Sequence, residues 1–98
     1  MTHVSIDQNK ITAFCRKHHI SRLSFFGSVL RDDFGPESDV DVLVEFQAGF
    51  MPGLAFFNME QELSAIIGRK VDLNTPGFLS PYFRDEVVAE SVTEYAAA

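Results

Sequence analysis

A short apolar segment interrupted by acidic residues constrains the fold of this chain more than any other feature. Acids and valines alternate along it, in the order Asp39, Val40, Asp41, Val42 and Val44. Residues two apart on a β-strand project from the same face, so the valines are expected to point into a core. The two aspartates then lie side by side on the opposite face. The segment is therefore predicted to be a strand with one buried side and one acidic side.

The remaining sequence predicts short helices and strands that alternate around this segment. Helix signals are a capping box near the start, a glycine that stops the middle helix, and a Ser-Pro pair that begins the last one. The expected helices cover residues 6–18, 54–67 and 80–91, with a short one after Gly27, and the expected strands cover 22–26, 40–46 and 70–74. This order indicates the α/β (α+β) class, with a small mixed or antiparallel sheet flanked by helices.

The length of 98 residues allows one core and little more. A chain of this size buries only roughly 60–70% of the surface that its unfolded form exposes. We therefore expect a single domain over residues 1–95 and a disordered tail at 96–98. A second lobe for binding a separate substrate does not fit.

Charge and cysteine content exclude several classes of function. The formal net charge is −6 and only eight lysines and arginines are present, whereas a nucleic-acid surface needs clustered basic residues. Direct nucleic-acid binding is therefore not expected. The single Cys15 cannot form an intramolecular disulfide, and no apolar run reaches the length of a membrane span. The expected location is the cytoplasm, away from any membrane.

The pair Asp39 and Asp41 suggests a metal site. Two carboxylates on one small surface repel each other unless a cation lies between them, and Mg²⁺ prefers such hard oxygen ligands. The alternative is that Asp39 ends a turn and that Asp41 faces solvent on a half-exposed strand. An isolated Asp-x-Asp pair does not decide between these interpretations.

The pair Gly27 and Ser28 suggests a site for phosphate. A glycine at the end of a strand, followed by a short helix, presents backbone N–H groups to an anion, and the serine adds a hydroxyl. A metal ion held by Asp39 and Asp41 could bridge the same phosphates. The alternative is an ordinary turn between a strand and a helix.

The two pairs together carry a resemblance to a known family. The chain contains the segments Phe26-Gly27-Ser28-Val29-Leu30-Arg31 and Asp39-Val40-Asp41, and ten residues separate Ser28 from Asp39. This arrangement resembles the Gly-Ser-x₁₀-Asp-x-Asp signature of DNA polymerase β-like nucleotidyltransferases. It is most similar to the minimal nucleotidyltransferases, small single-domain proteins often paired as antitoxins with a HEPN-domain ribonuclease toxin. The resemblance extends from about Leu23 to Tyr95.

The resemblance implies a role for each residue of the signature. Gly27 and Ser28 would form the turn that binds the phosphates of ATP, while Asp39 and Asp41 would bind two Mg²⁺ ions together with a third carboxylate, Asp72. Arg31 would contact the nucleotide, although Asp32 follows it where some relatives have glycine, and an ion pair with nearby acids is an equal alternative. Arg69 and Lys70 are compatible both with phosphate contacts and with solvated charges.

Three functions are compatible with these residues. The first is an enzyme that transfers AMP from ATP to a hydroxyl of a partner protein, implied to be a HEPN-domain toxin that it neutralises in a hetero-oligomer. The second is a non-catalytic, nucleotide-binding antitoxin that occludes its partner. Repelling carboxylates favour the enzyme, because a pure binding protein has no reason to hold them together. The third, modification of a small molecule, needs an acceptor pocket that a chain of this length does not provide.

Two further features stay outside the predicted site. Glu60 and Glu62 on the middle helix are expected to belong to a solvated face. Phe56 and Phe57 are adjacent and therefore diverge on that helix. The sequence leaves open whether one of them is exposed, with Phe50 or Met51, as part of a protein-binding surface or whether all belong to the core.

Overall fold

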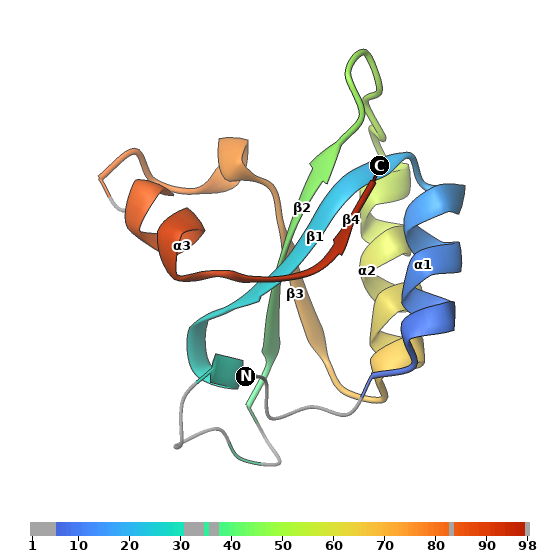
Figure 1. Ribbon diagram of the computed structural model, residues 1–98, viewed down its shortest axis with the longest axis horizontal. Helices are drawn as coiled ribbons and strands as arrows, with labels where there is room; N and C mark the ends of the chain where they lie inside the picture. Colours follow the sequence, from blue (N-terminus) through green and yellow to red (C-terminus); the bar gives the residue numbers. More distant parts are fainter. Residues whose placement is uncertain (1–5, 31–34, 36–37, 83, 98) are drawn as a thin grey trace.

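Four strands form one mixed sheet in the order β3-β2-β1-β4 (Figure 1). A computed structural model describes residues 6–30, 35, 38–82 and 84–97. The strands are β1 (Ile20–Phe26), β2 (Val40–Phe46), β3 (Val71–Asn74) and β4 (Val92–Ala96). β1 pairs antiparallel with both β2 and β4, whereas β2 and β3 are parallel. The mixed sheet confirms the predicted fold class.

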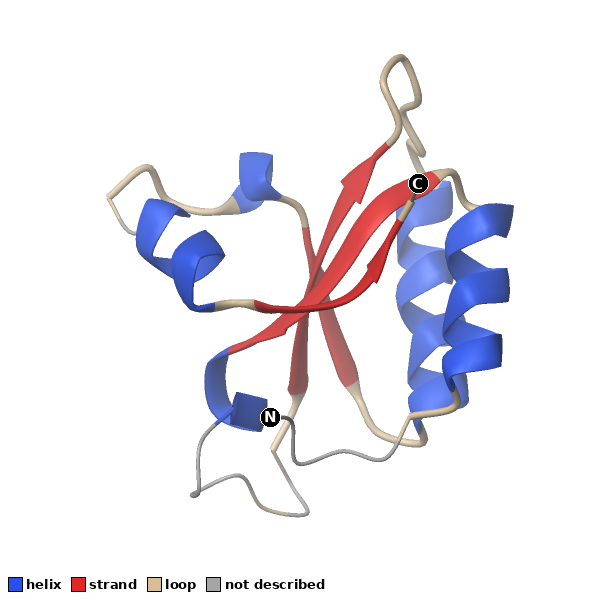
Figure 2. Ribbon diagram, in the orientation of Figure 1, coloured by secondary structure: helices blue, strands red, loops and turns tan. Residues whose placement is uncertain are grey.

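Two helices lie side by side along the sheet, and the third lies on the other side of the strands in Figure 2. They are α1 (Gln8–Lys17), α2 (Ala55–Ile67) and α3 (Arg84–Glu90). Asp7 caps α1, because its carboxylate accepts hydrogen bonds from the backbone N–H groups of Asn9 and Lys10. Gly68 ends α2 in the left-handed conformation, as the sequence predicts. No helix within the described residues is long and apolar enough to cross a membrane.

The core lies between the sheet and the pair α1 and α2. Its buried side chains include Ile11, Phe14, Cys15, Leu23, Phe25, Val40, Val42, Val44, Met59, Leu63, Val71 and Leu73. The three valines of β2 are fully buried, which confirms the predicted orientation of the acidic strand. Burial also raises the pKa of the Cys15 thiol to about 12, so this cysteine is a core residue rather than a nucleophile.

Side chains of α2 cover the outer edge of the sheet. The N–H groups of Val71 and Leu73 on the edge strand β3 donate to Ser64 Oγ at 3.0 Å and Glu60 Oε2 at 2.9 Å. Unpaired strand edges are otherwise open to association with other chains. The prediction that Glu60 belongs to a solvated face is therefore wrong, because its carboxylate is an acceptor for the sheet.

The C-terminal end differs most from the sequence-based expectation. The last helix ends at Glu90, and the chain then forms β4, a strand that was not predicted. Ala96 pairs with Arg22, and the Ala97 N–H donates to the Ser21 carbonyl at 2.8 Å. Residues 96 and 97, which the sequence predicts to belong to a tail, therefore continue the pairing of β4. Without β4, the backbone N–H and C=O groups along the second edge of β1 would lack these hydrogen bonds.

Candidate functional site

Asp41 lies on the central strand β2, between the other elements of the predicted site. In the strand register it is opposite Asp72 on the parallel strand β3 and opposite Phe26 on the antiparallel strand β1. Its valine neighbours are buried under α1 and α2, so Asp41 projects from the other face. Asp41 is half-buried, whereas Asp39, directly before β2, and Asp72 are exposed. The sheet therefore brings Asp41 and Asp72 to adjacent positions.

Gly27 follows β1 directly and lies against the Asp41 carboxylate. Its φ angle is +74°, in the left-handed region that favours glycine, and it begins the short 3-10 helix η1 (Gly27–Leu30). A Cβ atom at this position would lie 2.3 Å from Asp41 Oδ2. Glycine is therefore required both by the backbone conformation and by the neighbouring carboxylate. The predicted phosphate turn and the predicted acidic strand meet at this contact.

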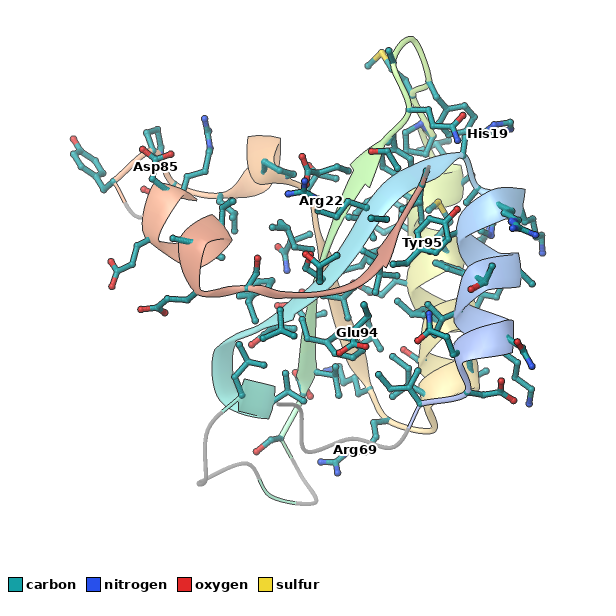
Figure 3. All side chains as sticks on the ribbon, viewed as in Figure 1. His19, Arg22, Arg69, Asp85, Glu94 and Tyr95 are labelled. Carbon is teal, nitrogen blue, oxygen red and sulfur yellow. The ribbon has the colours of Figure 1, made fainter. Side chains whose placement is uncertain are left out.

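Two basic residues lie where α2 leads into β3. Lys70 Nζ is 3.9 Å from Asp39 Oδ2, and both side chains are largely exposed, so this ion pair contributes little stability. Arg69 is half-buried, and its Nη2 donates to the backbone carbonyls of Gly35 and Ser38. Figure 3 shows Arg69 at the end of the sheet where the chain enters β2. Arg69 is thus engaged with the loop before Asp39.

The chemistry of the acidic side chains fits a divalent cation. Within the described residues, no group of three histidine, cysteine, aspartate or glutamate side chains is arranged to hold a metal ion by itself. Mg²⁺, however, is usually bound by one or two carboxylates together with substrate phosphates rather than by a complete protein cage. Asp39 and Asp41 beside a glycine turn match that kind of shared site.

The structure describes only the backbone of one further predicted site residue, Ser28, and does not describe another, Arg31. Ser28 belongs to η1, but its side chain lies outside the described part of the structure. Arg31 lies outside the described residues altogether. Their assigned contacts with the nucleotide stay predictions from the sequence.

An apolar pocket of about 350 Å³ lies at the opposite end of β2 from the acidic residues. It is lined by Phe46, Phe50, Met51, Pro52, Gly53, Phe56 and Thr75. Phe56 is buried, whereas Phe57 and Met51 are 66% and 89% exposed. The question left open by the sequence is thereby answered: Phe57 and Met51 are exposed, and Phe56 belongs to the core.

Sequence comparison connects this arrangement to known proteins. The nucleotidyltransferase domain family matches residues 8–93. The chain belongs to this family. A Methanocaldococcus jannaschii protein provisionally named a protein adenylyltransferase is 34% identical over 85 residues, which cover 87% of this chain and 90% of the relative. The resemblance identified from the signature residues is confirmed, and the chain is a nucleotidyltransferase enzyme.

Solved structures show the same fold in toxin–antitoxin complexes. A chain of one such complex with AMP-PNP has a TM-score of 0.74 at 22% identity, and the alignment covers 94% of this nucleotidyltransferase and 75% of that chain. A second structure contains a tri-AMPylated Shewanella oneidensis HEPN toxin with an MNT antitoxin. Its matching chain has a TM-score of 0.65 at 23% identity, with 92% and 70% covered. At these identities the comparison establishes the fold.

Proposed function

We propose that this nucleotidyltransferase transfers AMP from ATP to a hydroxyl of a partner protein, and that Asp39 and Asp41 bind the Mg²⁺ ions that the reaction needs. The observation that carries the proposal is the contact between Gly27 and the Asp41 carboxylate. It places a turn suited to phosphate directly beside a ligand suited to Mg²⁺, so one triphosphate could reach both. The protein adenylyltransferase name of the Methanocaldococcus relative supports AMP as the transferred group.

Each residue of the site has a distinct task in this proposal. Asp39 and Asp41 supply carboxylate oxygens to the metal, and Gly27 lets phosphate oxygens approach the backbone. Ser28 and Arg31 add contacts to the triphosphate. Mg²⁺, when bound, would stabilise the charge that develops on the phosphate oxygens. Asp72 is the third carboxylate, and its position opposite Asp41 suits a role close to the acceptor hydroxyl.

The proposed reaction is a single displacement at phosphorus. The acceptor oxygen forms a bond to the α-phosphorus of ATP while the bond from that phosphorus to the bridging oxygen breaks. Pyrophosphate leaves, and the proton of the acceptor hydroxyl is released. The protein contributes mainly position and electrostatic stabilisation, as is general for transfer of phosphoryl groups.

We further propose that the acceptor is on a HEPN-type toxin and that the two proteins form a hetero-oligomer. In this proposal the acceptor hydroxyl is brought to the site by the partner protein rather than by a small molecule. The solved complex of an AMPylated HEPN toxin with an MNT antitoxin supports this class of partner. An added AMP group near a ribonuclease site would repel RNA phosphates and so inactivate the toxin.

Intact-mass spectrometry of the partner tests the proposal. After incubation with this protein, Mg²⁺ and ATP, the partner should gain mass in steps of one AMP, and the gain should disappear with Asp39→Asn/Asp41→Asn. A matched control is Asp85→Asn/Glu86→Gln on α3, which removes the same charge from exposed positions. A partner that is inhibited in a stable complex but never modified would instead establish inhibition by occlusion.

A further inference from the structure

Arg69 connects two parts of the chain that the predicted site depends on. It lies between α2 and β3, and one of its guanidinium nitrogens, Nη2, donates to the carbonyls of Gly35 and Ser38, the latter at 3.1 Å. Gly35 and Ser38 are also bonded to each other. The Ser38 N–H donates to the Gly35 carbonyl and the Gly35 N–H to Ser38 Oγ, both at 3.1 Å. Arg69 therefore binds two residues, Gly35 and Ser38, that are bonded to each other, and Ser38 directly precedes Asp39.

The segment between α2 and β3 fixes the backbone on both sides of Asp39. On one side, Arg69 holds the Ser38 carbonyl. On the other, the Val40 N–H donates to the Lys70 carbonyl at 2.8 Å. Asp39 is exposed, so neither burial nor strand pairing of its own fixes its direction. These two neighbouring hydrogen bonds hold the backbone that carries its carboxylate, which also lies 3.9 Å from Lys70 Nζ.

The end of α2 places Arg69 for this task. Gly68 has a φ angle of +79°, and its N–H donates to the Ser64 carbonyl at 2.8 Å. This conformation ends the helix and changes the direction of the chain. Arg69 follows immediately. An arginine presents several donors in a planar group, so it can serve two carbonyls at once.

We infer that Arg69 is a positioning residue for the metal site: it holds the Asp39 carboxylate where Asp39 and Asp41 can share one divalent ion. This inference rests on the proposed metal-binding role of the two aspartates. Hydrogen-bond partners that orient metal ligands typically affect metal affinity by about 10–100-fold. Arg69 acts through the loop, and the nucleotide phosphates are contacted by other groups.

The test measures how much Mg²⁺ is needed for ATP binding, by calorimetry at a series of Mg²⁺ concentrations. Arg69→Gln should raise the half-saturating Mg²⁺ concentration by about 10-fold. The affinity for ATP at saturating Mg²⁺ should stay within about twofold of the wild-type value, because the groups that contact ATP are unchanged. Arg69→Lys keeps a donor that can reach the carbonyls and should recover much of the loss. Arg16→Gln, which removes the same charge from an exposed position on α1, should leave both values unchanged.

The alternative results are distinguishable. Weaker ATP binding at saturating Mg²⁺ would make Arg69 a direct phosphate contact. An unchanged Mg²⁺ requirement would show that the hydrogen bonds of Arg69 do not affect the metal site. Either result overturns the inference. Wild-type ATP binding that does not depend on Mg²⁺ would overturn the proposed function as well. Hydrogen exchange of the Val40 amide reports the Arg69 hydrogen bonds independently of any metal. It should accelerate in Arg69→Gln and stay near the wild-type rate in Arg69→Lys, and Arg69→Met serves the same comparison if the glutamine variant does not fold.

Discussion

Replacing Gly27 by alanine tests whether the proposed phosphate turn and the acidic strand form one site. The added Cβ would lie 2.3 Å from Asp41 Oδ2, 3.2 Å from its Cγ and 3.5 Å from its Cβ. Only the last of these is an ordinary contact distance. The Asp41 carboxylate must therefore move away from the turn, or the turn must move away from β2.

Two separate costs add to the destabilisation by Gly27→Ala. The left-handed backbone costs a residue other than glycine about 1–2 kcal/mol. Overpacking of a close contact costs typically about 1–3 kcal/mol more. The sum of about 2–5 kcal/mol should leave a typical domain folded but less stable. Gly49→Ala is the matched control, because Gly49 has a φ angle of +82° with nothing within 4 Å of its added Cβ. It should show the first cost alone.

A double-mutant cycle with Asp41→Ala isolates the contact. Alanine at 41 removes Oδ2 and Cγ and leaves only the Cβ at 3.5 Å. In that background Gly27→Ala should cost no more than Gly49→Ala, which gives a coupling of about 1–3 kcal/mol in chemical denaturation. Gly27→Ala alone should also weaken Mg²⁺-dependent ATP binding, measured by calorimetry. A coupling below about 0.5 kcal/mol, together with unchanged ATP binding, would refute the reasoning.

Three other side chains give independent predictions. Asp72→Asn should lower AMP transfer at least about 10-fold while ATP affinity changes less than about twofold, because the proposed third carboxylate would act near the acceptor. Single-turnover rates and calorimetry separate the two effects. Burial raises the pKa of Glu62, but hydrogen bonds and charge from His18 and Lys17 outweigh it and hold that pKa below its usual value. Its stabilisation is present above the unfolded-state pKa and is lost as pH falls through the folded one, so the deficit of Glu62→Gln in unfolding free energy should shrink between about pH 6 and pH 3. Cys15, with its pKa of about 12, should resist iodoacetamide at pH 8 until urea unfolds the protein, as alkylation followed by mass spectrometry can show.

The acidic strand could be predicted from the sequence because its signal is local. Alternation of acids and valines fixes which side of the strand is buried, whatever pairs with it. The prediction of residues 40–46 matches β2, and the valines are buried as expected. β4 has no such signal, because its residues are only half-buried or exposed and its stability comes from pairing with β1, about 70 positions earlier in the chain.

The same distinction applies to the site. A period of two places Asp39 and Asp41 on one face without reference to other strands. The position of Asp72 opposite Asp41 depends on the order and register of β2 and β3, which the sequence does not encode locally. The contact of Gly27 with Asp41 likewise depends on the register of β1 and β2. Residue types could therefore be assigned, whereas the distances between them could not.

The connection from α2 to β3 controls two of the three acidic residues through different contacts. β3 has only four residues and lies at the edge of the sheet, so pairing with β2 alone gives it few hydrogen bonds. Glu60 and Ser64 bind the N–H groups on either side of Asp72 and thereby align the strand that carries it. Arg69 then binds the loop before Asp39. Both sets of contacts begin on one helix and the turn that follows it, so α2 and this turn help to set where Asp39 and Asp72 lie relative to Asp41. If these carboxylates share a ligand, as proposed, its binding should stabilise α2 against the sheet.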